Sequence, residues 1–309
     1  MSDDPLLHLA LALQASGHTF TTVTPATHAR VNARPANAWA RGPVDVFGWC
    51  RPFHEGVLAP QLFEAMRCAD VLQKHGDGWV TQVRASTLHG HMFLHSAYPT
   101  TASDAVFFGP DTHRFADAIA RHLAGGARVQ RAVDIGCGAG PGAVVIARQR
   151  PLAEVFAVDI NHRALRYTAI NARVAGARRV VARRSDLLSG VDGEFDLIVA
   201  NPPFLLDAGE RTYRHGGGRL GEGLSLAIAA LAATRLAAGG TMLLYTGTAI
   251  TQGHDHFRAQ VTPLLDADGL AWDYRELDPD VFGEELAEPA YADAERIAAV
   301  LLTVRKPAA

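Results

Sequence analysis

The sequence has 309 residues, of which 48% are apolar and 20% are charged, and its formal net charge is −3. This composition is typical of a folded globular protein and excludes one built to coat nucleic acid by charge alone. There is no apolar run of about eighteen residues that would predict a transmembrane helix.

The first residues lack the basic start and small-residue cleavage site of a secretory signal. Three scattered cysteines form neither a disulfide framework nor a paired metal motif. We therefore expect a cytoplasmic protein that does not associate with membranes.

Residues 1–105 predict an α+β accessory domain that serves substrate recognition. "LLHLALALQAS" and "PQLFEAMRCADVLQKHG" are typical of helices, whereas "WVTQVRAST" and "HGHMFLHSAYPT" are typical of strands bounded by glycine and proline. Helices followed by a small hairpin favour a winged-helix-like arrangement. His89, His91 and His95 would share one strand face, but no cysteine or paired carboxylate accompanies them, so we expect no metal site.

Residues 106–309 predict a second domain in which strands alternate with helices. The expected strands are "RAVDIG", "VFAVDI", "VVARRSD", "DLIVANPP", "TMLLYTGTAI", "GLAWDYREL" and "ERIAAVLLTVR". Such alternation is typical of a doubly wound α/β sheet with helices on both faces, and one of the last two strands is a candidate for antiparallel pairing. The helical segment "LSLAIAALAATRLAAGG" is expected to stop at Gly239-Gly240.

Four arginines lie in "ARRVVARRSD", residues 177–186. We interpret them as a solvated helix end and strand flank. The low overall basic content argues against tight nonspecific RNA binding.

A glycine-rich loop, "VDIGCGAGPGA", follows the first of these strands and opens a helix. Gly136, Gly138 and Gly140 allow positive φ and close approach of a ligand, and the free N–H groups of a helix start suit an anionic group. Residues 138–143 also satisfy a loose G-x-G-x-x-A, so a dinucleotide-dependent oxidoreductase is an alternative.

Two carboxylates favour a different ligand. Asp134, two residues before the loop, suits an ammonium group better than a pyrophosphate. Asp159, at the end of "VFAVDI", lies where a carboxylate binds both hydroxyls of a ribose.

"VDIGCGAG", "AVDIN", "SDLL" and "NPPF", in this order and spacing, resemble the class I S-adenosylmethionine-dependent methyltransferases. The resemblance covers roughly residues 106–305 and implies a seven-stranded, doubly wound, Rossmann-like methyltransferase sheet with S-adenosyl-L-methionine as cofactor. It further implies that the loop of Gly136, Cys137, Gly138 and Gly140 passes under the methionine part of the cofactor, with the Cys137 side chain filling space.

The same resemblance implies roles for other cofactor-binding residues. Asp134 is expected to place the amino group and Asp159 the ribose, while Ile160 flanks the adenine. Asp186 should meet the adenine amine, with Leu187 offering its backbone.

The tetrapeptide "NPPF" (residues 201–204) ends an apolar strand at the edge where open α/β sheets bind ligands. The Asn201 side-chain oxygen and the Pro202 carbonyl can accept hydrogen bonds from the two N–H groups of a planar amine or amide. Phe204 offers a ring face, and Pro203 is expected to contact substrate. These acceptors would aim a delocalised nitrogen lone pair at the methyl group, so Asn201, Pro202 and Phe204 are the predicted catalytic residues and Asn201 also lies beside the cofactor.

Further similarity is to the small-domain methyltransferase group, near the release-factor glutamine methyltransferases and RNA N-methyltransferases. "FGPDTHRFADAIARHL" resembles their Pro-Glu-Thr segment at Pro110, Asp111 and Thr112, with Asp in place of Glu, and implies that Thr112 contacts substrate. We expect N-methylation of a protein glutamine or an RNA base. The alternatives are N-methylation of a small nitrogen-containing metabolite and a non-catalytic binding module.

Overall fold

Six α-helices in the described part of the chain begin at a proline, namely those starting at residues 5, 25, 43, 60, 110 and 141. A proline at the first helical position has its φ already set and lacks only an N–H that would be unpaired there. The computed structural model describes residues 4–207, 211 and 213–308. A proline thus marks the start of six of the ten α-helices in the described residues.

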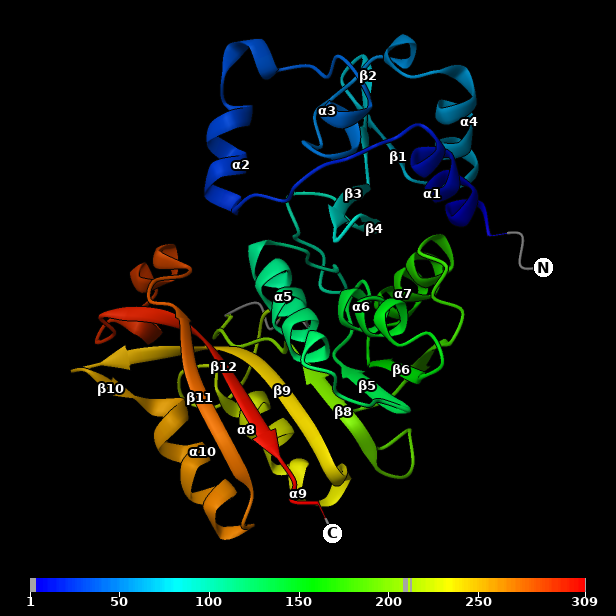
Figure 1. The fold of residues 1–309 in the computed structure, drawn as a ribbon. Coiled ribbons are helices and arrows are strands. Elements are labelled where there is room, and N and C mark those ends of the chain that lie inside the picture. Colours follow the sequence, from blue (N-terminus) through cyan, green and yellow to red (C-terminus); the bar gives the residue numbers. More distant parts are fainter. Residues whose placement is uncertain (1–3, 208–210, 212, 309) are drawn as a thin grey trace.

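The N-terminal part contains helices followed by two antiparallel strand pairs (Figure 1). Its elements are α1 (Pro5–Ala15), α2 (Pro25–Asn32), η1 (Pro35–Asn37), α3 (Pro43–Phe47), η2 (Glu55–Val57), α4 (Pro60–Cys68), β1 (Leu72–His75), β2 (Gly78–Thr81), β3 (Val83–Leu88) and β4 (His91–Ser96). β1 pairs with β2 and β3 with β4, so the helix-then-strand order agrees with the sequence expectation.

The remainder contains one large sheet with the strand order β11-β12-β9-β8-β5-β6-β7. Its strands are β5 (Arg131–Ile135), β6 (Glu154–Asp159), β7 (Val180–Arg184), β8 (Phe195–Ala200), β9 (Leu236–Thr251), β11 (Ala271–Asp278) and β12 (Arg296–Arg305), and the short β10 (His254–Asp255) pairs with β9. β5 to β9 run parallel, and β12 is antiparallel to both of its neighbours. The predicted doubly wound, Rossmann-like sheet of seven strands is confirmed, with β10 as an added eighth.

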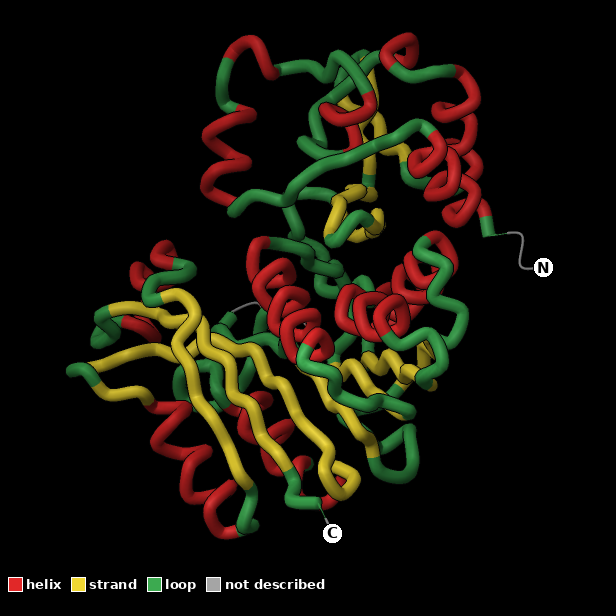
Figure 2. Tube along the Cα trace, in the orientation of Figure 1, coloured by secondary structure: helices red, strands yellow, loops and turns green. Residues whose placement is uncertain are grey.

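Helices cover both faces of this sheet (Figure 2). α5 (Pro110–Ala124), α6 (Pro141–Gln149) and α7 (His162–Val174) lie on one face, and α8 (Gly223–Ala230), α9 (Ala232–Arg235) and α10 (His256–Ala267) lie on the other. Alternate residues of β8 enter two separate cores: Leu197 and Val199 pack on the first face, Ile198 on the second. Burial on both faces explains why the strand sequence is apolar without interruption.

The predicted helix stop at Gly239-Gly240 is wrong. α9 ends at Arg235, and β9 already begins at Leu236, opposite Phe195. The two glycines instead form an irregularity in the β8–β9 pairing: Gly239 has φ +75°, and a Cβ on Gly240 would lie 2.9 Å from the Phe195 carbonyl oxygen. Glycine is needed here for a close strand approach rather than for ending a helix.

The C-terminal crossover contains two short 3₁₀ helices, η3 (Gly283–Ala287) and η4 (Pro289–Tyr291). They bring Phe282 and Glu284 to the cavity described below. Among the described residues, no helix is long and apolar enough to cross a membrane.

One buried amide links the N-terminal part to the sheet domain. The Asn171 side chain, on α7, accepts a hydrogen bond from the Leu94 N–H (2.8 Å) and donates to the Leu94 carbonyl (2.9 Å) of β4. Its Nδ2 also donates to the Ala139 carbonyl (2.8 Å) in the glycine loop. Three elements that are distant in sequence therefore meet at a single, fully satisfied side chain.

Replacing this amide tests its structural role. In Asn171→Ala the backbone groups of Leu94 and Ala139 lose their partners inside the protein, and we expect the free energy of unfolding to fall by about 2–4 kcal/mol. Denaturant unfolding measures the change, with Gln149→Ala, at an exposed amide, as the control. Asn171→Asp keeps one acceptor but faces two carbonyl oxygens with a carboxylate, so it should be no more stable than Asn171→Ala. A change within 0.5 kcal/mol of the control, about the usual effect of a surface substitution, would contradict the role.

Candidate active site at the carboxyl ends of the strands

The glycine loop is bound to the neighbouring strand. The N–H groups of Gly136 and Cys137 both donate to the Val158 carbonyl of β6, at 2.9 and 3.0 Å. Gly136 and Gly138 have φ of +67° and +54°, and a Cβ on Gly136 would meet no heavy atom within 4 Å. The backbone conformation thus requires glycine, while the space above the loop stays open for a ligand.

Gly140 plays a different part from the other two loop glycines. It has φ +81°, and a Cβ there would lie 2.9 Å from the Thr168 side chain of α7. It caps α6 and does not line the cavity. Cys137 is buried beneath the loop, with its Sγ 3.4 Å from the Thr168 hydroxyl, and burial raises the pKa of its thiol well above the usual range.

Asp134 lies at the end of β5 with 1% of its surface exposed. Its Oδ2 accepts a hydrogen bond from the Ala143 N–H (2.9 Å) at the start of α6. Burial raises the pKa of Asp134 to about 7, and the nearby Asp159 carboxylate acts in the same direction, whereas the Ala143 N–H opposes the rise.

Asp159 ends β6 and lies across the glycine loop. Its two oxygens accept hydrogen bonds from the Gly138 N–H (3.0 Å) and the Asn161 N–H (2.9 Å). Burial raises its pKa, and these N–H groups oppose the rise. Ile160 is 49% exposed at the rim of the same cavity. The hydrogen bond between Gly138 and Asp159 therefore fixes the glycine loop and the Asp159 side chain relative to each other.

The turn after β7 brings a third carboxylate to the cavity. The Ser185 hydroxyl donates to the Leu187 carbonyl (2.8 Å) and accepts from the Gly190 N–H (2.8 Å). These side-chain hydrogen bonds support a turn in which Leu187 has φ +48° and Asp186 is exposed at the cavity.

The NPPF motif, residues 201–204, lies next to the glycine loop because β8 pairs directly with β5. Asn201 follows β8, is half-buried, and its side chain has no hydrogen-bond partner among the described residues. The Pro202 carbonyl accepts no backbone hydrogen bond from the part of the chain that is described. An amide and a carbonyl are thus free to bind a ligand.

Phe204 is buried, with 8% of its surface exposed. Its ring meets Phe282 edge to face, with centroids 5.6 Å apart, and a Cβ on Gly247 of β9 would lie 2.3 Å from it. Gly247 therefore makes room for the ring, which holds the motif against β9 while still lining the cavity.

The start of α5 contributes Asp111 and Thr112. The Thr112 hydroxyl accepts a hydrogen bond from the Gly109 N–H (3.2 Å), which caps the helix. Asp111 accepts hydrogen bonds from the Tyr245 hydroxyl and from Arg114 (3.2 Å), and burial raises the pKa of its carboxyl. Both residues line the cavity.

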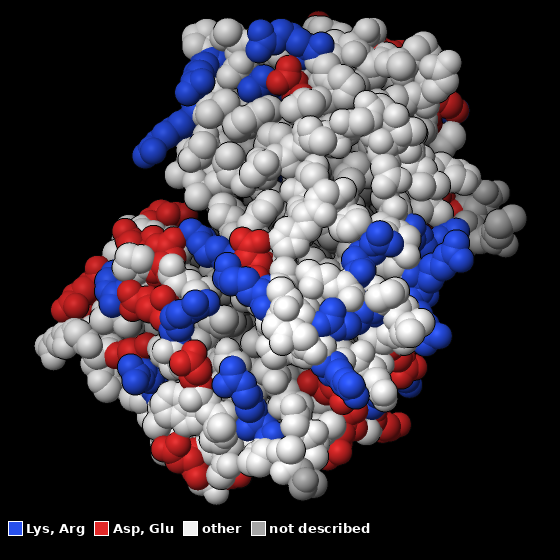
Figure 3. All heavy atoms as spheres, in the orientation of Figure 1, with Lys and Arg blue, Asp and Glu red and all other residues white. Residues whose placement is uncertain are grey.

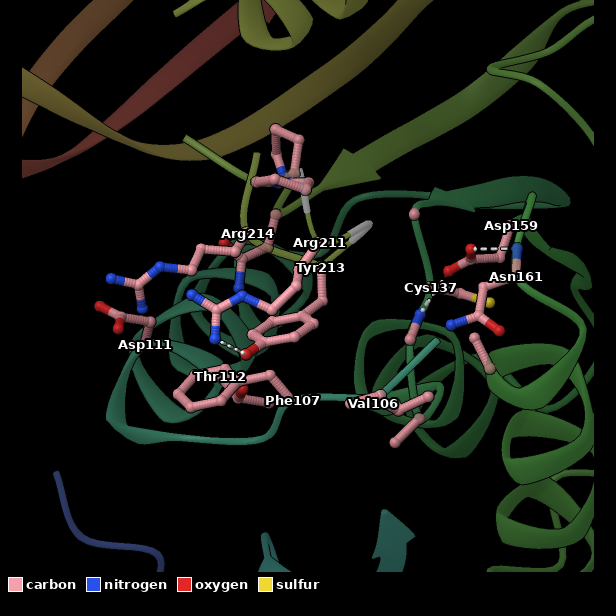
Figure 4. Close-up of a pocket in the computed structure, with 18 of the residues that line it drawn as sticks. Val106, Phe107, Asp111, Thr112, Cys137, Asp159, Asn161, Arg211, Tyr213 and Arg214 are labelled. Carbon is pink, nitrogen blue, oxygen red and sulfur yellow. Dashed lines mark hydrogen bonds between the residues drawn. The ribbon is translucent and has the colours of Figure 1, made fainter. Parts of the chain in front are cut away.

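A loop after the motif closes the other side of the cavity (Figure 4). The Tyr213 hydroxyl donates to the Thr100 carbonyl (2.7 Å), and its ring is nearly parallel to that of Phe107, with centroids 6.0 Å apart. Arg211 and Arg214 also line this side; each forms an ion pair with Asp207, and Arg214 forms another with Glu285.

These elements enclose a cavity of about 400 Å³, within the usual range for small-molecule sites. The predicted residues that line it are Asp134, Gly136, Cys137, Gly138, Asp159, Ile160, Asp186, Leu187, Asn201, Pro202, Pro203, Phe204 and Thr112. The structure thus brings together all predicted site residues except Gly140.

The sequence interpretation missed several lining residues. Phe107, Arg211, Tyr213 and Arg214 lie on the motif side, and Pro25 and Tyr98–Thr101 come from the N-terminal part. None of these residues belongs to a recognisable motif. The sequence feature closest to them is the glycine-rich segment that begins at Tyr213.

The prediction that His89, His91 and His95 share one strand face is wrong, because His89 lies in the turn between β3 and β4, with φ +50°. His89 Nε2 lies 2.7 Å from Asp117 Oδ1, whereas His95 lies 2.8 Å from the Ser86 hydroxyl and stacks on Phe108. No group of three or more His, Cys, Asp or Glu side chains in the described ranges is arranged to hold a metal.

The cavity has two chemically different ends. Near the glycine loop, the Asp134, Asp159 and Asp186 carboxylates suit a ligand with a cationic group and hydroxyls or amines. Near the motif, free amide and carbonyl oxygens suit N–H donors. The open space above Gly136 and Gly138 lies between the β5 and β6 strand ends, so an extended ligand with these groups fits the residues that are present.

Comparison with known proteins yields a consistent group. A family model described as the methyltransferase small domain matches residues 101–250. The release factor glutamine methyltransferase of Bordetella pertussis is 32% identical over 189 residues, which are 59% of this chain and 67% of that protein. The 4-amino-L-phenylalanine/4-methylamino-L-phenylalanine methyltransferase of Streptomyces pristinaespiralis is 31% identical over 183 residues, 55% of this chain and 63% of that protein.

A solved structure of wild-type Trm5b from Pyrococcus abyssi has a similar fold, with a TM-score of 0.51 and 16% identity over 76% of this chain and 62% of that one. The chain spans 67% of the Bordetella pertussis relative and 63% of the Streptomyces pristinaespiralis relative, and less than half of several other curated relatives that it matches.

The raised pKa of Asp134 predicts a pH-dependent stability. Between about pH 4 and pH 7 the folded protein keeps this carboxyl protonated while the unfolded chain does not, so stability falls as pH rises through that range. Asp134→Asn keeps a hydrogen-bond acceptor but cannot ionise. We expect the wild-type free energy of unfolding to fall relative to this variant by up to about 4 kcal/mol over the interval. Denaturant unfolding at several pH values measures it, and parallel pH profiles would refute the assignment.

Proposed function

The chain belongs to the class I S-adenosylmethionine-dependent methyltransferases with a methyltransferase small domain, and we propose that it methylates a planar nitrogen. The substrates that we propose are a protein glutamine amide or an RNA base amine. The observation that carries the proposal is the unpaired Asn201 amide, which lies in the same cavity as Asp159 and one strand away from the glycine loop.

The glycine-loop end of the cavity is the proposed cofactor site. Asp159 would hold the ribose hydroxyls, Ile160 would flank the adenine, and Asp186 with the Leu187 backbone would meet the adenine amine. Asp134 and the loop of Gly136 to Gly140 would hold the methionine part. When bound there, S-adenosylmethionine supplies an electrophilic methyl group.

The motif end is the proposed substrate site. The Asn201 side-chain oxygen and the Pro202 carbonyl accept the two N–H groups of the substrate, which orients the nitrogen lone pair and raises its electron density. Phe204 and Pro203 contact the planar group, and Thr112 contacts substrate at the start of α5. Enclosure by Phe107 and Tyr213 keeps bulk water from competing for the same acceptors.

We further propose that residues 106–309 form the catalytic unit and that residues 1–105 recognise the substrate in the cytoplasm. Pro25 and Tyr98–Thr101 support this division of labour, because they reach the cavity from the N-terminal part. Tyr213 is joined to Thr100 by its hydroxyl, so the two parts meet at the substrate end.

A small nitrogen-containing metabolite is a second candidate substrate. The observation that favours it is the contribution of Pro25, Tyr98 and Pro99 to the cavity wall, since a covered cavity suits a small molecule. The relative from Streptomyces pristinaespiralis, named for methylation of an amino-phenylalanine, is consistent with such a substrate.

Transfer of labelled methyl from S-adenosylmethionine into a cell extract, followed by separation of protein, RNA and small molecules, tests the proposal. Label in protein or RNA supports a macromolecular substrate, and label in small molecules alone supports the metabolite. Binding of the cofactor without any transfer would instead identify a non-catalytic binding module.

Asn201→Ala tests the orienting role. The variant loses an acceptor used in the reaction, so we expect kcat to fall about a hundredfold or more while cofactor affinity stays within about twofold. Asp159→Ala is the matched comparison and should weaken cofactor binding first. Calorimetry and methyl-transfer assays measure the two quantities. If Asn201→Ala lost cofactor affinity as severely as rate, its proposed role would be wrong.

A further inference from the structure

One segment of the chain is rich in basic residues and lacks acidic ones. Between Ile160 and Ser185 there are seven arginines and no aspartate or glutamate. With +7 in this segment and −3 overall, the rest of the chain carries −10. The low net charge therefore does not exclude RNA binding, because this segment is strongly basic while the rest of the chain is acidic.

The segment folds into α7, the turn after it and the edge strand β7, which pack against each other. We call its outer surface the arginine face; its residues are Arg163, Arg166, Arg173, Arg178, Arg179, Arg183 and Arg184. All seven side chains are exposed. Figure 3 shows basic side chains close together beside α7, whereas acidic and basic side chains are interspersed on the opposite side of the view.

Most of these charges are available to a partner. Arg163 pairs with Asp104 and Arg166 with Asp4, but the other five form no ion pair with a described residue. Arg148, at the end of α6, adds to the surface, because it lies close to Gly176 in the turn. Charges on an edge strand discourage aggregation. That role accounts only for the arginines of β7 and leaves Arg173 of α7 and the two arginines of the turn unexplained.

The arginine face is continuous with the cavity at both ends of the segment. Asp159 and Ile160 precede α7, and Asp186 and Leu187 follow β7; all four line the cavity. A chain bound along this face would therefore reach the mouth of the site. We propose that the arginine face binds the phosphate backbone of an RNA substrate, an inference that rests on the proposed methyltransferase function.

Phosphates fit this surface better than base edges. Guanidinium groups bind phosphate oxygens through two parallel N–H groups. The face carries no exposed aromatic ring among its described residues, so it lacks a platform for stacking bases. The unpaired arginines lie at the end of α7, in the turn and on β7, and this short cluster of charge matches a few consecutive phosphates of a strand. Binding of this kind positions the RNA, while the cavity selects the base.

The test uses the full chain and the double variant Arg183→Glu/Arg184→Glu. Arg128→Glu/Arg275→Glu is the matched control: it makes the same charge change at exposed arginines, one of them on β11 at the opposite edge of the sheet. Fluorescence anisotropy measures binding of a short labelled single-stranded RNA at several salt concentrations.

We expect the β7 variant to bind the RNA at least about tenfold more weakly than the control. Its slope of log affinity against log salt should be smaller by about 1.4, because neutralising one phosphate of a single strand accounts for about 0.7 of the slope and the variant removes two arginines. Cofactor affinity should be unchanged in both variants.

Three outcomes would overturn the inference: equal RNA affinity in the two variants, competition by poly-L-glutamate as effective as competition by RNA, or unchanged methyl transfer into RNA by the β7 variant. In the last case the proposed function stands and the surface assignment fails. If instead the β7 variant loses RNA binding but the wild type transfers no methyl group, the surface stands and the proposed function fails.

Discussion

The side chain of Asn171 is the constraint on which the arrangement of the site depends. It is a single amide whose donor and acceptor atoms are all used, on β4 of the N-terminal part and on the glycine loop. Because buried polar groups are costly when unpaired, this geometry allows little relative movement of the three elements. The glycine loop, α7 and β4 of the N-terminal part are therefore held together by hydrogen bonds to one side chain.

Several polar side chains that line the cavity are held by the protein and can still bind a ligand. Asp134 and Asp159 accept hydrogen bonds from backbone N–H groups, and neither forms an ion pair with a described residue. Buried carboxylates without a cation are unfavourable, which raises their pKa values and favours a positively charged ligand beside them. On the motif side Asn201 is free, whereas the arginines are already paired with Asp207 and Glu285. The two ends of the cavity thus favour different chemical groups.

Much of this architecture could be predicted from local sequence. The strands and the order in which they meet helices follow from apolar runs and proline starts, and "NPPF" lies where the strand ends, as predicted. Two glycine positions depend on packing that local sequence does not show. Gly140 does not line the cavity because Thr168 of α7 lies against it, and the predicted helix stop at Gly239-Gly240 is wrong because the Phe195 carbonyl lies against Gly240 in the β8–β9 pairing. In both cases a neighbour distant in sequence decides what the glycine does.

The residues at the glycine-loop end of the cavity could be predicted from sequence, because they lie where parallel strands end and match motifs that resemble those of class I methyltransferases. The opposite wall of the cavity could not be predicted, because it depends on packing between distant segments. Phe107 and Tyr213 are far apart in the chain, and their rings meet because the segment before α5 packs beside the loop that follows the motif. Thr100, from the N-terminal part, reaches them by accepting a hydrogen bond from the Tyr213 hydroxyl. The tertiary structure also brings α7 and β7 together, so that arginines far apart in the chain are exposed on neighbouring elements. Local sequence specifies which conformations the backbone adopts, whereas side chains from separate segments become neighbours only through packing.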